Sequence, residues 1–117
     1  MNRIRKAIES QYKGICNVYE YRKVKDEVTK ITKQQEVIVL ENQPCKLSYE
    51  QINATSGEVP AVTMSAKLFI SPDVEIKAGS KIVVTQNNVT TAFANSGLPG
   101  RYTNHQEIML NLFEKWG

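Results

Sequence analysis

The stretch SPDVEIKAGSKIVVTQNNV, residues 71–89, has a clear pattern of strands and turns. Two short apolar runs, VEI and KIVV, lie on either side of Gly79. Glycine readily adopts a positive φ, so Gly79 predicts a turn between two strand ends. Asn87 and Asn88 follow, and since asparagine tolerates the left-handed region, they predict a two-residue hairpin. The stretch therefore predicts antiparallel β structure.

Outward from this stretch, apolar and polar residues alternate on both sides. The segments CKLSYE (residues 45–50) and VTMSAKLFI (residues 62–70) alternate as strands with one face on a core. In HQEIMLNLFEKW, Ile108, Leu110 and Leu112 alternate as in a strand, whereas Ile108, Leu112 and Trp116 fit a helical period. We expect a strand to about Leu112, because the short strands before it need a partner at their edge.

The N-terminal segment has a helical pattern instead. Ile4, Ile8 and Tyr12 are spaced four residues apart, and Gly14 is placed to end a helix. We therefore expect one domain over residues 1–117, with a helix in residues 1–13, a β region in residues 14–112 and a tail in residues 113–117. The fold class predicted is mostly β, a small antiparallel barrel or sandwich of six to eight short strands.

Two segments of the β region carry further expectations. Residues 51–61, QINATSGEVPA, are rich in turn-forming residues and predict a long loop. Loops of this length are commonly functional. The continuous apolar run VIVL, residues 37–40, predicts a strand that is buried on both faces or covered, and Pro44 is expected to interrupt it.

Composition and charge limit the classes of function. The chain is 41% hydrophobic and 23% charged, as in an ordinary globular domain, and has no apolar run long enough to cross a bilayer. Residues 1–35 hold nine basic against four acidic residues, and residues 36–117 hold six against eight. The N-terminal third is therefore positive, and it suits either nucleic acid, an acidic protein surface or a solvated face.

Catalytic and metal-binding patterns are missing from the sequence. Cys16 and Cys45 each stand in an apolar segment, so we expect buried thiols and no disulfide. With His105 as the one histidine, they lack the close spacing of a zinc site. No nucleophile or phosphate-loop motif surrounds them. We expect neither an enzyme nor a cofactor.

Nucleic-acid binding is an alternative function. In YEYRKVK, Tyr19 and Tyr21 alternate beside Arg22, Lys23 and Lys25. Aromatic and basic residues on one strand face could stack bases and neutralise phosphates, as in an OB-like module. Tyrosines at alternate positions also serve as core or interface residues.

Two segments together, AKLFISPDVEIKAGSKIVVT and RYTNHQEIML, give a more specific indication. They resemble the head-closure (neck, stopper, head-tail connector) proteins of tailed bacteriophages and related prophages. The residues that match are Pro72, Val74, Ile76, Gly79, Ile82, Val84, Tyr102, His105 and Glu107. The resemblance covers mainly residues 66–112, and we take Pro72, Gly79, Tyr102 and His105 as its structural motif.

The resemblance implies a structural particle protein. Such a chain forms a ring of its own copies below the portal-adaptor proteins, joins the tail-terminator proteins and helps retain packaged double-stranded DNA. Its location would be the virion neck or a phage-like particle, after synthesis in the bacterial host cytoplasm, with no membrane contact.

The resemblance also suggests which residues meet partners. The loop expected to face the central channel and DNA contains Asn53, Ala54, Thr55, Ser56, Gly57 and Glu58. The residues expected to contact ring neighbours or partners are Ile4, Ile8, Tyr12, Phe113 and Trp116.

Overall fold

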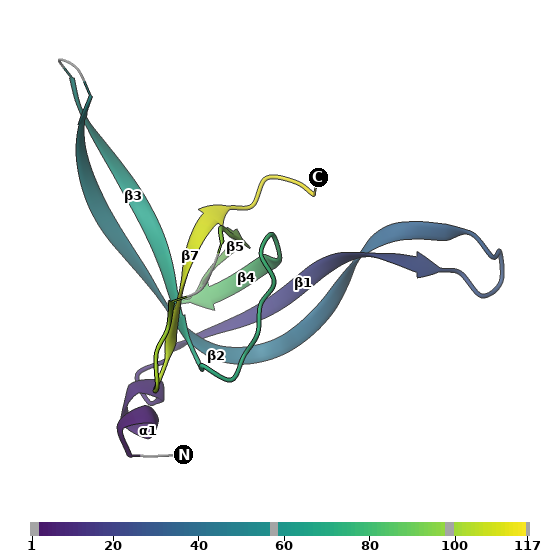
Figure 1. Ribbon diagram of the computed structural model, residues 1–117, viewed down its shortest axis with the longest axis horizontal. Helices are drawn as coiled ribbons and strands as arrows, with labels where there is room; N and C mark the ends of the chain where they lie inside the picture. The colour runs from purple at the N-terminus through teal and green to yellow at the C-terminus, as the bar shows by residue number, and fades with distance from the viewer. Residues whose placement is uncertain (1–2, 57–58, 98–99, 117) are drawn as a thin grey trace.

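A computed structural model describes residues 3–56, 59–97 and 100–116, with the backbone alone over residues 51–56 and 59–64. Over these residues the chain forms one short helix, α1 (Arg3–Glu9), and seven strands (Figure 1). The strands are β1 (Gly14–Lys25), β2 (Thr32–Ser56), β3 (Val59–Ile70), β4 (Lys81–Gln86), β5 (Val89–Asn95), β6 (Gly100–Arg101) and β7 (Gln106–Leu112).

The strands belong to one antiparallel sheet whose hydrogen bonding closes on itself. Their order is β3-β2-β1-β4-β5-β7-β6, and an additional pairing joins β3 to β7. Six strands therefore form a continuous ring of pairings, and β6 is attached to β7. Closure of this kind satisfies the backbone groups that an open sheet would leave at its edges. The predicted fold class, mostly β with antiparallel strands and one short N-terminal helix, is confirmed.

The core lies inside this ring. Phe93, Leu68 and Ile82 each expose at most 2% of their surface, and each buried side chain of this size contributes about 1.5–3 kcal/mol of transfer free energy. The remaining buried apolar residues are Cys16, Val18, Cys45, Leu47, Ala66, Ile70, Ile76, Val84, Ile108 and Leu110. The alternation predicted for residues 66–70 and 108–110 is thus confirmed.

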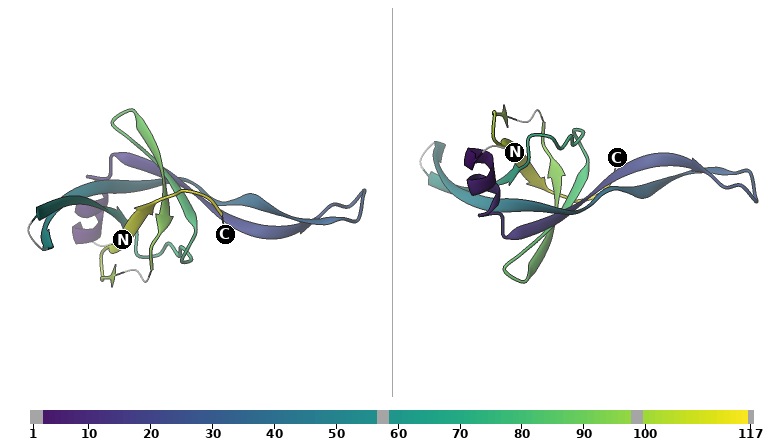
Figure 2. Two further views of the ribbon diagram at one scale, coloured as in Figure 1. Left: turned by 90° about the horizontal axis from the view of Figure 1, so that it is seen from above. Right: turned by 90° about the horizontal axis from the view of Figure 1, so that it is seen from below.

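Two long hairpins extend from the ring (Figures 1 and 2). β1 pairs with β4 only up to Tyr19, and residues 20–25 pair with β2 alone. β3 pairs with β7 only from Ala66 onward, and residues 59–65 pair with β2 alone. We name these the β1–β2 arm (residues 20–38) and the β2–β3 arm (residues 50–65). The 25-residue strand β2 contributes one side of both arms.

The arms make the molecule extended. Its radius of gyration is 16.9 Å, whereas a compact chain of this length is expected near 13 Å. Its principal extents are 56 × 47 × 27 Å. Figure 2 shows the β1–β2 arm reaching well beyond the other strands. The described side chains of residues 20–38 include none that is buried.

The loop predicted over residues 51–61 is wrong. β2 continues to Ser56 and β3 begins at Val59, with the two strands in register from Cys45↔Ile70 to Ser56↔Val59. Continuous ladder pairing outweighs the turn preferences of Asn, Thr and Ser in this segment. Pro60 is tolerated because β3 has no second neighbour there, so no ladder hydrogen bond is lost on its far side.

The expectation of a buried strand over residues 37–40 is also wrong. Ile38 and Val39 are 39% and 37% exposed, because this part of β2 pairs only with β1. Pro44 does not interrupt the strand, because β2 runs through it and it pairs with Ile15 of β1. The register shifts on both sides of Val18, and each of the two irregularities takes up one extra residue of β2.

The run VEI, expected to be a strand end, lies in a loop over residues 71–80. Its apolar residues still reach the core: Ile76 is buried, and Val74 packs against the core from the side. Gly79 has a φ of 83°, as the turn requires.

Three further predictions have clear outcomes. Asn87 and Asn88 have φ values of 54° and 64° and join β4 to β5 as a two-residue hairpin, which confirms that prediction. The C-terminal segment is a strand to Leu112, as expected. The helix ends at Glu9, short of the expected residue 13, and none of its residues is buried. β1 then begins at Gly14.

Candidate functional site

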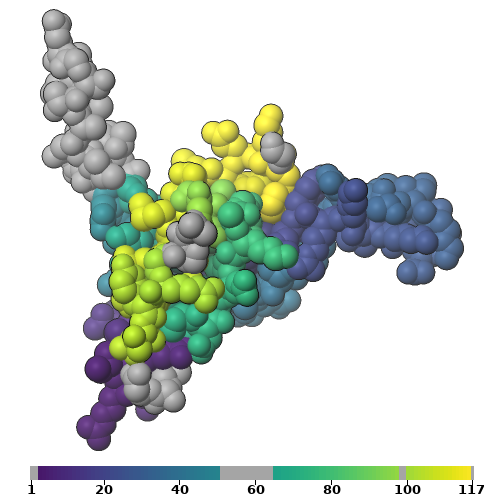
Figure 3. All heavy atoms as spheres, viewed as in Figure 1, coloured from purple at the N-terminus to yellow at the C-terminus, as the bar shows by residue number. Residues whose placement is uncertain are grey.

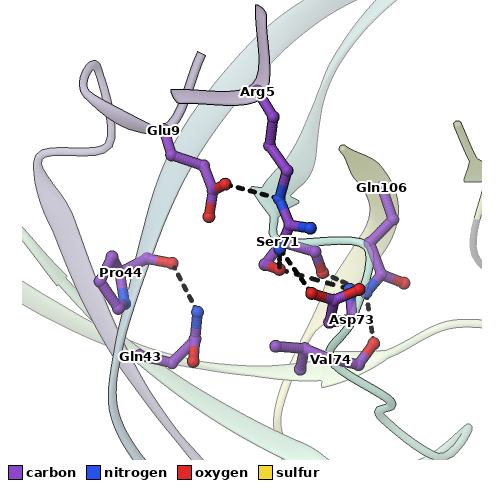
Figure 4. A network of polar contacts seen from close by, with 8 residues as sticks. All are labelled: Arg5, Glu9, Gln43, Pro44, Ser71, Asp73, Val74 and Gln106. Atoms are coloured by element: carbon purple, nitrogen blue, oxygen red, sulfur yellow. Dashed lines mark hydrogen bonds and ion pairs between the residues drawn. The ribbon is translucent and has the colours of Figure 1, made fainter. Parts of the chain in front are cut away.

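The helix α1 is fastened by one arginine to the loop that follows β3 (Figure 4). Arg5 Nη2 donates to Ser71 Oγ at 2.6 Å and to Asp73 Oδ2 at 2.7 Å, and its Nε donates to Glu9 Oε2 at 2.8 Å. The carboxylates of Asp73 and Glu9 raise the pKa of Arg5. Because the helix has no buried residue, this polar anchor is central to its placement.

The loop over residues 71–80 is held by two buried amide side chains. Gln106 Nε2 donates to the carbonyl oxygens of Ser71, at 2.8 Å, and Val74. Asn95 Nδ2 donates to the carbonyls of Ile76 and Lys77 at 3.0 and 3.2 Å. These bonds satisfy loop carbonyls in place of a neighbouring strand. They also join the two halves of the predicted motif, since Gln106 stands directly after His105.

The motif residues before β7 form a stacked group. The rings of Tyr102 and His105 lie 4.8 Å apart and nearly parallel, and His105 Nε2 lies 3.1 Å from Glu107 Oε2. Lys67 Nζ lies 3.0 Å from the other oxygen of Glu107. Hydrogen bonds from His105 and then Lys67 lower the pKa of Glu107. The group links β3 to the start of β7.

Phe113 and Trp116 of the tail pack on their own chain. Trp116 stacks on Tyr21 with ring centroids 5.2 Å apart, and Phe113 meets Trp116 edge to face at 5.0 Å. Lys81 Nζ lies 5.0 Å above the Phe113 ring, and both Lys81 and Trp116 donate to Glu36 Oε1. The tail therefore braces the base of the β1–β2 arm.

This bracing bears on the nucleic-acid alternative. One face of Tyr21 is covered by Trp116, and Tyr19 lies under Lys81 at 5.6 Å. Arg22 Nη2 is paired with Glu20 at 2.7 Å. A base would have to displace these contacts in order to stack on either tyrosine.

The helical residues expected to meet partners divide into two groups. Ile4 is 64% exposed, whereas Ile8 and Tyr12 are half-buried beside a hollow that Lys46 and Phe69 also line. The hydroxyl of Tyr12 is buried and has no hydrogen-bond partner among the described residues. Burial raises the pKa of Tyr12.

The residues predicted to face a channel belong to the far end of the β2–β3 arm. The backbone of Asn53, Ala54, Thr55 and Ser56 is the last part of β2. Gly57 and Glu58 lie outside the described residues. The β2–β3 arm was missed from the sequence, although the unbroken alternation on both sides of residues 51–61 was a signal for its hairpin.

Groups able to do covalent or metal chemistry are sparse. Cys16 and Cys45 are buried free thiols, and their mutual hydrogen bond together with burial raises the pKa of Cys16. Within the described residues, no three His, Cys, Asp or Glu side chains are grouped so as to hold a metal ion. No helix in the described part of the chain is long and apolar enough to cross a membrane.

Comparison with known proteins finds a likeness in structure. The chain is similar to the phage-like element PBSX protein xkdH from Bacillus subtilis, with a TM-score of 0.50 and 12% sequence identity. The likeness covers 84% of this chain and 91% of that chain. The sequence matches no known family profile and no curated protein sequence. The two proteins therefore share a fold, and that fold occurs in a phage-like element.

Proposed function

We propose that this chain is a structural subunit of the neck of a tailed phage or phage-like particle. It would form the head-closure ring between the portal-adaptor proteins and the tail-terminator proteins, and help retain packaged double-stranded DNA. The shared fold with a protein of a phage-like element carries the proposal, because it extends over most of both chains. The contact between Gln106 and the loop that contains Pro72 and Gly79 supports it, since it makes the motif one connected unit.

In this role an arm takes the place of the loop that was expected to face the channel. The β2–β3 arm, which carries residues 53–58, is the candidate for reaching the channel and the DNA. The chain would act by assembling into the particle and would catalyse no reaction. It would be made in the host cytoplasm and would then be part of the neck.

The role is tested by assembling particles without the chain, with a copy supplied in trans as the control. We expect heads that package DNA, lose it and fail to join tails. Electron microscopy and nuclease-protected DNA measure both steps. Filled heads that keep their DNA and acquire tails normally would exclude the proposal.

The channel element is tested by shortening the β2–β3 arm. Replacing residues 55–60 with Asn-Gly removes its last two paired positions and supplies a two-residue turn. We expect a folded protein and neck assembly, with DNA leaking from filled heads. The matched control replaces Asn87-Asn88 of the β4–β5 hairpin with Asn-Gly and should retain DNA. If particles with the shortened arm retain DNA normally, another element of the chain must reach the channel.

A further inference from the structure

The tip of the β1–β2 arm presents apolar side chains to solvent. Val28 is 90% exposed and Ile31 is 54% exposed. The arm stands clear of the rest of the molecule in the space-filling view (Figure 3). Aliphatic side chains this exposed, at the end of a projecting hairpin, suit a contact with another surface.

The tip is already ordered before any contact forms. Asp26 Oδ1 accepts from the backbone N–H of Val28 at 2.8 Å and of Thr29 at 3.2 Å. Backbone bonds join Asp26 N to Ile31 O and Lys30 N to Asp26 O, and Lys30 holds a φ of 61°. A turn fixed in this way loses little conformational entropy when it docks.

The tip is also basic. Residues 22–33 contain five basic and two acidic side chains, a net charge of +3. One of those acids, Glu27, lies 3.9 Å from Lys30. Lys25 and Lys33 have no ion pair with any described residue, so they are available to a partner.

A hollow of complementary character lies at the fork where the β2–β3 arm leaves β7. Its volume is about 410 Å³. We call it the fork groove, and its lining residues are Tyr49, Ala66, Phe93, Leu110, Asn111, Leu112 and Glu114. Tyr49 and Leu112 are 53% and 69% exposed, and Glu114 is an exposed acid at the groove.

We propose that the arm tip of one copy docks into the fork groove of the next copy. Val28 and Ile31 would cover Tyr49 and Leu112, while Lys30 and Lys33 would face Glu114. The β1–β2 arm points away from β3 and β7, so a chain does not fill its own groove (Figure 1).

The contact joins two different surfaces and is therefore head-to-tail. Repeated contacts of this type close into a ring when the rotation allows. The docking contact would build the ring of the proposed function, and the ring itself rests on that proposal. The contact itself is tested on the purified chain, so its failure would not be confused with failure of the neck role.

A second copy fits the observations better than DNA does. Phosphates would pair with the lysines but leave Val28 and Ile31 in water, and Glu114 of the groove would repel a nucleic acid. Only a polypeptide with an apolar, basic end complements the fork groove, and the arm tip has both properties.

Charge reversal tests the contact on the full-length protein. We expect the wild-type chain to self-associate with rising concentration in sedimentation velocity. Lys30→Glu with Lys33→Glu should weaken association by about tenfold or more, and Glu114→Lys should weaken it as well. An equal mixture of the two variants should associate again, because each tip then meets a groove of opposite charge. The proposal would be overturned if the lysine variant lost its binding to duplex DNA and the mixture of variants did not regain the mass of the associated species. That result would indicate a nucleic-acid contact instead.

Cross-linking tests the geometry. A bis-maleimide should join Val28→Cys in one copy to Leu112→Cys in another, because these residues would meet. Val89→Cys is the matched control, since Val89 is 61% exposed but lies on the β4–β5 hairpin. Cys16 and Cys45 are buried and should not react. The contact would be refuted by two results together. The wild-type chain would stay monomeric at every concentration, and Val28→Cys would be joined to Leu112→Cys no better than to Val89→Cys.

Discussion

At the scale of single residues, side-chain amides complete the backbone hydrogen bonding of this sheet. Gln86 of β4 shows this most clearly. Its Oε1 accepts from Leu47 N at 2.9 Å and its Nε2 donates to Leu47 O at 3.0 Å. Gln86 thereby pairs with a part of β2 that β1 no longer reaches, since that pairing ends at Gly14↔Cys45.

Removing this amide should destabilise the fold. We expect Gln86→Ala to lower the free energy of unfolding by about 2 kcal/mol, because two backbone groups of the buried Leu47 lose their partner. Urea unfolding followed by circular dichroism measures the change. Gln34→Ala, at an exposed position of the β1–β2 arm, is the control and should change it by less than about 0.5 kcal/mol. Equal effects of the two substitutions would contradict the assigned role of Gln86.

At the scale of elements, α1 is docked by polar contacts. Arg5 reaches Ser71 and Asp73, and the helix itself is only seven residues long. A helix this short is not stable by itself in water, so its order depends on docking.

Breaking the anchor should therefore release the helix and leave the sheet intact. In Arg5→Ala we expect faster amide hydrogen exchange at residues 6–12 and unchanged exchange at the core strands. NMR exchange measurements resolve both regions. Arg3→Ala, which removes an exposed arginine from the same helix, should leave the exchange unchanged. Exchange in Arg5→Ala that matches the wild type would show that other contacts dock the helix.

The elements also show what the sequence could reveal. Strict alternation identified the core faces around Leu68 and Ile108, and the Asn87-Asn88 pair identified a hairpin, because both patterns are local. The β2–β3 arm was read as a loop, since its tip combines turn-forming residues with a proline, and only pairing across the hairpin overrides them.

The candidate sites were harder to predict for a related reason. Phe113 and Trp116 were predicted to contact a neighbour, and their contacts with Tyr21 and Lys81 of their own chain were not foreseen. Nothing local in the tail indicates that it returns to an arm almost a hundred residues earlier. The arm tip at Val28 and the fork groove depend on the same kind of long-range arrangement.

At the scale of the whole molecule, core and arms are separable. The buried residues belong to the ring of strands and its loop, and the described side chains of the β1–β2 arm add none. The arm should therefore be dispensable for folding.

Shortening the β1–β2 arm tests this separation. Replacing residues 22–35 with Asn-Gly keeps the Tyr21↔Glu36 pair and the Trp116 contacts. We expect the free energy of unfolding to change by less than about 1 kcal/mol, because no core contact is lost. The radius of gyration from small-angle X-ray scattering should fall below 16.9 Å, while the remaining β2–β3 arm keeps it above the value of about 13 Å for a compact chain. A loss of several kcal/mol would instead make the arm part of the folding unit.

The length of β2 has a mechanical consequence. One backbone runs without interruption from the end of one arm to the end of the other, a path of about 80 Å at the usual rise per strand residue. Asn42, with a φ of 50°, and the register shifts opposite β1 lie between the two ends. A load applied to either arm would pass along this strand and be taken up as bending at that point. β2 would thus bend within the sheet, so that each arm can tilt without moving the other.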